Sequence, residues 1–378
     1  MALLGASDRR PASPPAPAPS TVDAAAAPLV PGHEVYGFVP YWEIDDTIAA
    51  HLRATDASTV ALFSVTTTAR GAIATNQNGY RAINGAIGRT IIADAHRVGR
   101  RVDVTWTSFG TARNTAVFAS ERVQAAVIAA LVRLRSDLGV DGIAVDVEEL
   151  ADADIPAYGA FVGRLHAAVV AADPNATVTA TTGSGPRGAA MAVAATLAGV
   201  DRIFLMGYDY RTASSAPGAS APLSRADGDG RSISWSMELY ASAGVPVAKT
   251  ILGLPLYGLA WPTASGTLGA WGTGRGSIWI PRRNLAALAE PVAIKAFDPV
   301  EDSSFLATPA GDAWQSVYYD SPESLRPKLG YANENGLAGV GFWALGYERG
   351  LPDYTALIGA FRAGRSMATP SVTPSSAP

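Results

Sequence analysis

The sequence predicts an α/β fold: a closed (β/α)8 (TIM) barrel with a small α+β insertion between its seventh and eighth strands. Eight short runs of apolar and β-branched residues end in polar or aromatic residues. Helical stretches with apolar residues at 3.6-residue spacing separate most of these runs. Apolar strands that alternate with helices indicate a parallel sheet covered on its outer face. Eight such units predict a barrel with its active site at the carboxyl ends of the strands.

The predicted strands follow one another along the chain with helices such as 122–138 and 155–171 between them. They are Val35–Trp42, Thr59–Thr66, Arg101–Phe109, Gly142–Glu148, Thr177–Gly183, Arg202–Asp209, Lys249–Gly258 and Gly339–Gly346. An open doubly wound sheet is the alternative. That fold needs a Gly-rich phosphate loop after the first strand, and Trp-Glu-Ile-Asp (residues 42–45) stands there instead.

Three segments fall outside the repeating pattern. Residues 262–317 hold Gly- and Trp-containing pieces, a helical stretch at 284–290 and strand-like stretches at 293–297 and 314–318. They are predicted to form the insertion and one wall of the cleft. Residues 1–32 are rich in Pro and Ala, and residues 366–378 in Thr, Pro and Ser. Such compositions bury little apolar surface, so both ends are predicted to be disordered tethers around a barrel at 33–365.

Composition excludes several kinds of chemistry. The 378 residues include no Cys, so disulfides, cysteine nucleophiles and thiolate metal sites are excluded. The four His are scattered without metal-ligand spacing, and the run 227–230 (Asp-Gly-Asp-Gly) lacks the later ligands of a calcium loop, so it predicts a turn. We therefore expect neither a metal nor a cofactor.

Charge and hydropathy limit the partners in the same way. The net charge of -4 without a Lys/Arg run gives no reason to expect a nucleic-acid partner. No apolar stretch reaches the ~18 residues that a membrane span requires. A monomer is expected.

The fourth predicted strand carries paired carboxylates. Side chains alternate along a strand, so Asp146 and Glu148 share one face with Ala144, while the apolar residues 143, 145 and 147 share the other. In a barrel the apolar face meets the helices, so both carboxylates point inward at the end where active sites form. A buried charge without a partner is costly, which favours a functional role. The alternative is that both carboxylates cap loops or pair with arginines.

Residues 141–148, Asp-Gly-Ile-Ala-Val-Asp-Val-Glu, resemble the DGxDxDxE signature of glycoside hydrolase family 18, the chitinase family. Further runs are similar to other motifs of that family in the same order: 35–42 (first strand), 206–209 (Met-Gly-Tyr-Asp), 251–261 and 339–343 (Gly-Val-Gly-Phe-Trp). The likeness covers residues 33 to about 360. The run 319–325, Tyr-Asp-Ser-Pro-Glu-Ser-Leu, resembles most the branch of spore-cortex and peptidoglycan-lytic N-acetylglucosaminidases.

The resemblance implies a glycosidase that cleaves β-1,4-linked N-acetylglucosamine, in chitin oligomers or peptidoglycan, with retention and with the substrate's own acetamido group as nucleophile. Glu148 would be the general acid and then the base. Asp146 would orient the acetamido N–H and offset the developing positive charge, and Tyr208 would donate its O–H to the acetamido oxygen.

Three further residues would bind the sugar by the same resemblance: Asp209 by a polar contact, Trp343 as the apolar floor under the pyranose ring, and Met206 of the Met-Gly-Tyr-Asp motif. The alternative for Tyr208 and Trp343 is ordinary packing in the core. Packing and cleft lining are both open for the tryptophans at 42, 106, 235 and 261.

A second function stays open: a non-catalytic, lectin-like carbohydrate-binding protein on the same barrel. Retention of Glu148 argues against it, and Ala144 argues weakly for it. The resemblance and the tether-like ends imply an extracellular or cell-envelope location, although residues 1–10 lack the apolar core of a signal peptide.

Two positions depart from the family pattern together. Ala144 stands where the family usually has Asp, and Phe38 where it commonly has Tyr. In the common pattern those two groups hold the middle aspartate in its resting position by hydrogen bonds. Their joint loss predicts that Asp146 stays fixed toward Glu148, with lowered activity or a shifted pH optimum.

Restoring both groups tests this prediction. The double variant Ala144→Asp/Phe38→Tyr is expected to raise turnover or to move the pH optimum, because Asp146 regains its usual partners. Steady-state rates across the pH range measure both effects. A double variant with the same turnover and the same optimum would contradict the prediction.

Overall fold

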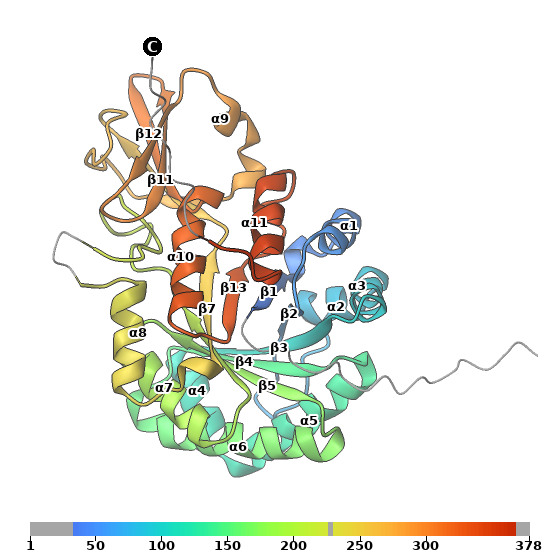
Figure 1. Cartoon of the computed structure of the whole chain (residues 1–378). Helices are drawn as coiled ribbons and strands as arrows, with labels where there is room; N and C mark the ends of the chain where they lie inside the picture. Colours follow the sequence, from blue (N-terminus) through green and yellow to red (C-terminus); the bar gives the residue numbers. More distant parts are fainter. Residues whose placement is uncertain (1–32, 226–229, 368–378) are drawn as a thin grey trace, which may run out of the picture.

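The computed structural model describes residues 33–225 and 230–367. Eight parallel strands close into a barrel in the order β1-β13-β7-β6-β5-β4-β3-β2, which confirms the predicted fold class (Figure 1). The barrel strands are β1 (Glu34–Pro40), β2 (Thr59–Val65), β3 (Arg101–Phe109), β4 (Gly142–Glu148), β5 (Thr177–Gly183), β6 (Arg202–Met206), β7 (Thr250–Pro255) and β13 (Gly339–Trp343).

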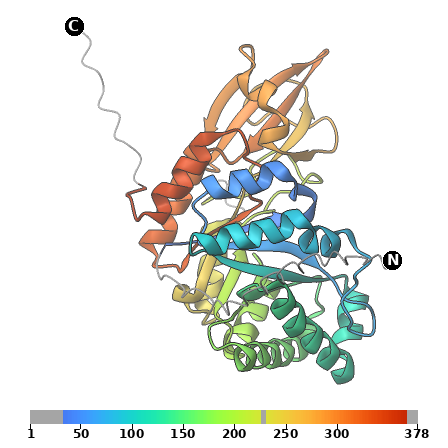
Figure 2. The same ribbon diagram turned by 90° about the vertical axis from the view of Figure 1, so that its right-hand side faces the viewer.

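Helices surround the barrel on its outside, as Figures 1 and 2 show from two directions. They are α1 (Asp46–Ala54), α2 (Asn78–Asn84), α3 (Ala86–Arg97), α4 (Thr111–Phe118), α5 (Glu121–Leu138), α6 (Ile155–Ala172), α7 (Pro186–Leu197), α8 (Ile233–Ser242), α10 (Pro322–Glu334) and α11 (Pro352–Arg362). Short 3-10 turns are η1 (Tyr41–Glu43), η2 (Asp152–Asp154) and η3 (Val247–Lys249).

Four barrel strands end two or more residues earlier than the sequence predicts, and the second ends one residue earlier, at Val65. The first gives way to a 3-10 turn after Pro40, the sixth ends at Met206, the seventh at Pro255 and the last at Trp343. The apolar pattern continues past these points because the next residues turn into the cavity above the barrel while remaining partly buried. The strand ends are therefore where the chain leaves the ladder to form the site.

The insertion is a second, antiparallel sheet with strand order β10-β11-β12-β8-β9. It lies at the top of the molecule in Figure 1, beyond one end of the barrel. Its elements are β8 (Gly258–Thr263), β9 (Ser277–Trp279), η4 (Pro281–Arg283), α9 (Leu285–Ala289), β10 (Ile294–Asp298), β11 (Ser303–Ala310) and β12 (Ala313–Tyr319). It starts at Gly258, before the predicted Pro262. A Cβ on Gly258 would lie 2.5 Å from the carbonyl oxygen of Tyr318, so this close pairing of β8 with β12 requires glycine.

Strand β4 separates two apolar layers, as its alternation predicts. Ile143, Val145 and Val147 belong to the large core between the strands and the helices. Ala144 faces the barrel interior, in a smaller cluster with Tyr36, Phe38, Ala61, Phe63, Phe204, Ile251 and Ala338. The barrel is therefore a packed interior with the two carboxylates of β4 above its apolar layer.

A buried carboxyl group lies lower in the same interior. The Tyr36 hydroxyl donates to Asp103 Oδ2 at 2.8 Å, and Asp103 is 1% exposed. Burial raises the pKa of Asp103 from 3.8 to about 6, with the Arg101 charge opposing that rise. The native protein thus holds this proton more strongly than the unfolded chain does.

Replacing this carboxyl group tests the pKa shift. The free energy of unfolding of the wild type should fall by up to about 3 kcal/mol as the pH rises from about 4 through 6. The reason is that Asp103 must then ionise, and its charged form is disfavoured in the folded protein. Asp103→Asn stays neutral and still accepts from Tyr36. Relative to wild type it should therefore gain stability between pH 4 and 7, measured by denaturant unfolding at both pH values. An identical stability difference at the two values would contradict the assignment.

Some sequence predictions lie outside the described residues: the tether at 1–32, the turn at 227–230 except Gly230, and the tail at 366–378 except Ser366 and Met367. Met367 is buried against the core. By length and composition, one helical segment among the described residues, Asp152–Ala172, passes as a membrane span. It includes α6, whose Phe161 and Leu165 are fully buried against the barrel, as in the core helix of a globular domain.

Candidate active site

A cavity of about 480 Å³ opens at the carboxyl ends of the barrel strands. It contains all six residues that the sequence singles out: Asp146, Glu148, Met206, Tyr208, Asp209 and Trp343. The other lining residues are Phe38, Tyr41, Trp42, Phe63, Ser64, Phe109, Thr181, Phe204, Tyr257, Ile278 and Tyr347. Within this lining, three carboxyl groups and many aromatic rings occur, and no Lys, Arg or His.

Glu148 is the last residue of β4 and is exposed to the cavity. Asn114 of α4, which is fully buried, donates from Nδ2 to the Glu148 carbonyl oxygen at 2.5 Å. Ser108 on β3 in turn donates to Asn114 Oδ1 at 2.7 Å. The chain then turns sharply at Glu149, which has φ 58°. The backbone of Glu148 is thereby fixed while its carboxyl group faces open space.

Asp146 lies two residues earlier on the same face of β4 and is 4% exposed. Thr181 of β5, its Cα partner in the sheet, donates a hydrogen bond from Oγ1 to Asp146 Oδ1. Burial raises the pKa of Asp146, the charge of Glu148 raises it further, and the Thr181 hydrogen bond opposes the rise.

The pKa of Glu148 is also raised, by partial burial first and then by the charges of Asp209 and Glu149. Two carboxyl groups that disfavour each other's ionisation share protons as a pair. The pair therefore keeps a proton to higher pH than either group would alone, which a general acid requires.

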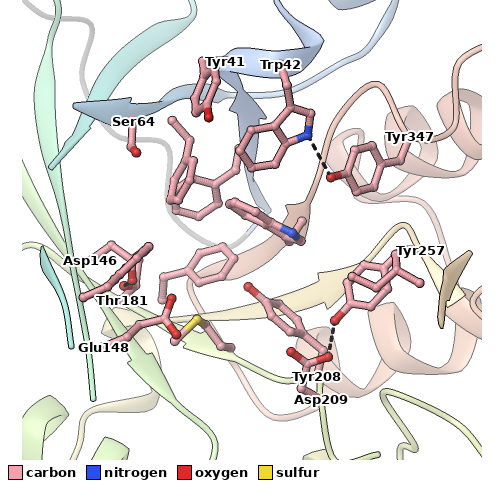
Figure 3. Close-up of a pocket in the computed structure, with 17 residues that line it drawn as sticks. Tyr41, Trp42, Ser64, Asp146, Glu148, Thr181, Tyr208, Asp209, Tyr257 and Tyr347 are labelled. Atoms are coloured by element: carbon pink, nitrogen blue, oxygen red, sulfur yellow. Dashed lines mark hydrogen bonds between the residues drawn. The ribbon is translucent and has the colours of Figure 1, made fainter. Parts of the chain in front are cut away.

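Tyr208 and Asp209 follow β6 and face Asp146 and Glu148 across the cavity (Figure 3). Burial and the nearby carboxylates raise the pKa of Tyr208 well above its usual value, so its hydroxyl stays a proton donor. Asp209 has φ 61°, and its Oδ1 accepts from the Tyr257 hydroxyl at 2.5 Å and from Ser220 Oγ at 3.3 Å. Burial raises the pKa of Asp209, and these two hydrogen bonds oppose that rise.

The insertion holds the loop that carries these residues. Glu301, which is 5% exposed, accepts from the Arg211 guanidinium at 2.8 Å and from the Ala219 backbone N–H at 2.5 Å. It also pairs with Arg225 at 3.2 Å. Ile278 of β9 lines the cavity directly. The insertion therefore supplies one wall of the cavity and anchors the loop after β6.

Aromatic rings make the opposite side of the cavity. Trp343, at the end of β13, contacts Phe63 with ring centroids 4.6 Å apart and Phe38 at 5.7 Å. Trp42 donates from its indole N–H to the Tyr347 hydroxyl at 3.2 Å, as drawn in Figure 3, and is 46% exposed. Such flat apolar surfaces beside carboxyl groups suit the two faces of a sugar ring.

The four tryptophans for which the sequence leaves packing and cleft lining open lie in different places. Trp42 lines the cavity, whereas Trp106 and Trp261 are buried at 0% and 1% exposure and pack in the core. Trp235 lies on α8 away from the cavity.

Sequence reasoning missed Thr181 and Tyr257. Thr177, Thr179 and Thr181 alternate along β5, a period-2 polar pattern that could have placed Thr181 in the barrel interior. Tyr257 lies within the run 251–261 that carried the resemblance. Neither pattern alone says which carboxylate each hydroxyl meets.

Within residues 33–225 and 230–367, no cluster of three or more His, Asp or Glu side chains has the arrangement of a metal site. The three carboxyl groups of the cavity instead have hydroxyl partners or one another's charge. The arrangement provides a proton donor, a partner carboxylate, a hydroxyl donor and an aromatic floor in one enclosure.

Comparisons with known proteins place this site in a family. Residues 103–348, more than half of the chain, match the model for glycosyl hydrolases family 18. Chitotriosidase-1 of Mus musculus is 28% identical over 157 residues, which are 39% of this chain and 33% of that protein. Across three curated relatives, the aligned part spans 33% to 62% of their length.

Solved structures share the fold. A family 18 chitinase of Cycas revoluta, determined with (GlcNAc)3, covers 87% of this chain and 99% of its own, with TM-score 0.73 and 17% identity. The spore cortex-lytic enzyme SleL of Bacillus cereus covers 86% of this chain and 74% of its own, with TM-score 0.69 and 16% identity. On the family match and the site geometry together, this chain belongs to family 18 of the glycosyl hydrolases.

Proposed function

We propose that this protein is a glycosidase that cleaves β-1,4-linked N-acetylglucosamine, in chitin oligomers or in peptidoglycan, by retaining, substrate-assisted catalysis. The observation that carries the proposal is the meeting of Asp146, Glu148, Tyr208 and Trp343 in one cavity, with the pKa of both carboxyl groups raised. The family match supports the same reaction class.

In the first step the Glu148 carboxyl group gives its proton to the glycosidic oxygen as the bond from that oxygen to C1 breaks. The acetamido carbonyl oxygen of the same sugar forms the new bond to C1, which gives an oxazolinium ion. Asp146 accepts from the acetamido N–H and offsets the positive charge, while Tyr208 donates to the acetamido oxygen. This is the substrate-assisted exception to the two-carboxylate glycosidase scheme.

In the second step Glu148, now a carboxylate, takes a proton from water. The water oxygen bonds to C1, and the bond from C1 to the acetamido oxygen breaks. C1 is attacked twice from opposite faces in turn, so its configuration is retained. Glu148 is then protonated again, and the acetamido group is regenerated.

Product analysis tests the proposal. Purified protein is incubated in parallel with chitotetraose and with peptidoglycan, and soluble products are identified by mass spectrometry. Cleavage between N-acetylglucosamine and the next sugar in either substrate supports it, and the arm that reacts identifies the substrate. Chitotetraose binding without release of reducing ends after long incubation would support the lectin-like alternative instead.

We further propose an extracellular or cell-envelope location, because both polymers lie outside the cytoplasm. The Pro- and Ala-rich composition of residues 11–31 supports this location as the kind of tether frequent in exported proteins. Fractionation of the native host with an antibody against the barrel tests it.

A further inference from the structure

Two of the residues that lie beneath Asp146 in the barrel interior are apolar. Ala144 and Phe38, at 0% and 2% exposure, lie in the apolar interior cluster. Phe38 packs edge-to-face on Phe204 with centroids 4.9 Å apart. A Cβ on Gly341 would lie 2.2 Å from the Phe204 ring, so glycine there makes room for this aromatic layer. A carboxylate that turned toward Ala144 and Phe38 would exchange its hydrogen bond for apolar contacts, which is unfavourable.

The side chain of Asp146 is held by Thr181 of the neighbouring strand β5. Asp146 and Thr181 are Cα partners on the adjacent strands β4 and β5. Both line the cavity, and Thr181 is 2% exposed. Its hydroxyl donates to Asp146 Oδ1 in a short contact. A hydrogen bond to a charged acceptor, shielded from water, is among the stronger ones in proteins.

The same hydroxyl has a second acceptor within reach. Thr181 Oγ1 lies 3.3 Å from the carbonyl oxygen of Val145, the residue before Asp146. One hydroxyl proton serves one of these acceptors at full strength. When Asp146 is ionised, the hydroxyl donates to the carboxylate. When Asp146 carries a proton, the hydroxyl oxygen can accept a hydrogen bond from the carboxyl O–H while the hydroxyl proton is donated to the carbonyl oxygen of Val145.

We propose that Thr181 is the positioning residue that holds Asp146 toward Glu148 and the substrate's acetamido group in both protonation states, in place of the polar groups absent at positions 144 and 38. This inference rests on the proposed function, since it names what orients a residue of that mechanism. Thr181 itself does not contact the reacting atoms. It acts through Asp146.

The titratable groups near Asp146 that could change its pKa come from three elements. Glu148 lies on the same strand, Tyr208 follows β6, and Tyr158 approaches from α6. Thr107 is its Cα partner on β3 and does not titrate. Burial raises the pKa of both tyrosines far above the working range, so they remain neutral. Burial, the charge of Glu148 and the Thr181 hydrogen bond therefore set the pKa of Asp146.

Removing the hydroxyl tests the inference. Thr181→Val keeps the size and β-branching of the side chain and deletes the hydrogen bond to the ionised carboxylate. The pKa of Asp146 should rise, so the acid limb of the kcat profile should move to higher pH by about one unit. At the wild-type optimum kcat should fall about tenfold with KM changed much less. Thr181→Ser, which keeps the hydroxyl, should restore the wild-type profile.

Thr182→Val is the matched control. Thr182 is the next residue of β5, is fully buried and faces the opposite side, where it accepts from the Tyr240 hydroxyl at 2.9 Å. Loss of the Thr182 hydroxyl should lower the melting temperature and leave the acid limb of the kcat profile at the wild-type pH. An acid limb that moves equally in Thr182→Val, or that stays in place in Thr181→Val, would overturn the inference.

Chitotetraose binding, followed by the fluorescence of Trp42 and Trp343, supplies a readout independent of turnover. If wild type binds without cleaving, the proposed function fails, and the inference is judged on the pH dependence of binding alone. If the acid limb of the binding profile lies at higher pH in Thr181→Val than in wild type, the inference is supported. If the limb lies at the same pH, the inference is overturned. If Thr181→Val does not fold, the same comparison is made with Thr181→Ala.

Discussion

Glu148→Gln is expected to abolish the release of reducing ends from N-acetylglucosamine polymers while binding persists. The amide keeps the shape of the side chain and cannot give a proton to the glycosidic oxygen. Loss of a general acid lowers rates by about 10²- to 10⁴-fold. The backbone of Glu148 is held by Asn114 and does not depend on its carboxyl group, so the cavity should keep its form. Reducing-end assays and chitotetraose titrations measure the two effects.

Glu149→Gln is the control for this prediction. Glu149 is the adjacent acid, is exposed and lies outside the cavity lining. Its charge raises the pKa of Glu148, so its removal should lower that pKa slightly and leave turnover within a few-fold of wild type. A Glu148→Gln protein that turns over like wild type would refute the assignment of the acid.

Asp146→Asn is the second substitution with a large expected effect. In the proposed mechanism it removes the carboxylate that accepts from the acetamido N–H and offsets the charge of the oxazolinium ion. Loss of one preorganised electrostatic group of this kind costs about 10²- to 10³-fold in kcat. The variant should fold well, because a buried carboxyl group with a raised pKa costs stability at neutral pH and the amide does not.

The pH profile of Asp146→Asn separates this role from simple misfolding. The charge of Glu148 raises the pKa of Asp146, so the pair keeps its last proton to higher pH than Glu148 alone would, and Asp146→Asn removes that effect. In the proposed mechanism Glu148 acts as the protonated acid, so the alkaline limb of the rate profile should move to lower pH. Rates across the pH range and a melting curve measure both effects. A lowered melting temperature together with an unmoved alkaline limb would mean that Asp146 is structural.

The inward orientation of Asp146 and Glu148 follows from sequence alternation, whereas the other four predicted site residues follow from the resemblance to family 18. On β4, Ile143, Val145 and Val147 meet the helices while Asp146 and Glu148 reach the cavity, as period-2 spacing requires. The pattern succeeds because a barrel strand has two chemically distinct sides. The resemblance to the family pattern identifies Ala144 as a missing polar group, and the structure places that residue within an apolar layer.

What the sequence could not supply depends on register between strands. Thr181 meets Asp146 because β4 and β5 pair with those two residues opposite each other, 35 positions apart in the chain. Tyr257 meets Asp209 across the loops after β6 and β7. Apolar periodicity does not encode such pairings. It also does not mark where a strand leaves its ladder, which is why four predicted strands extend into the loops above the barrel.

The proposed mechanism requires that the substrate's acetamido group bonds first to C1. Neither an enzyme carboxylate nor a directly attacking water forms that first bond. Proton NMR of the anomeric region during the first minutes of chitotetraose hydrolysis tests this most directly, with a fully deacetylated oligomer as the parallel substrate. We predict that the newly formed reducing end appears first as the β-anomer and that the deacetylated oligomer is not cleaved. Initial release of the α-anomer, or equal cleavage of the deacetylated oligomer, would contradict the substrate-assisted mechanism.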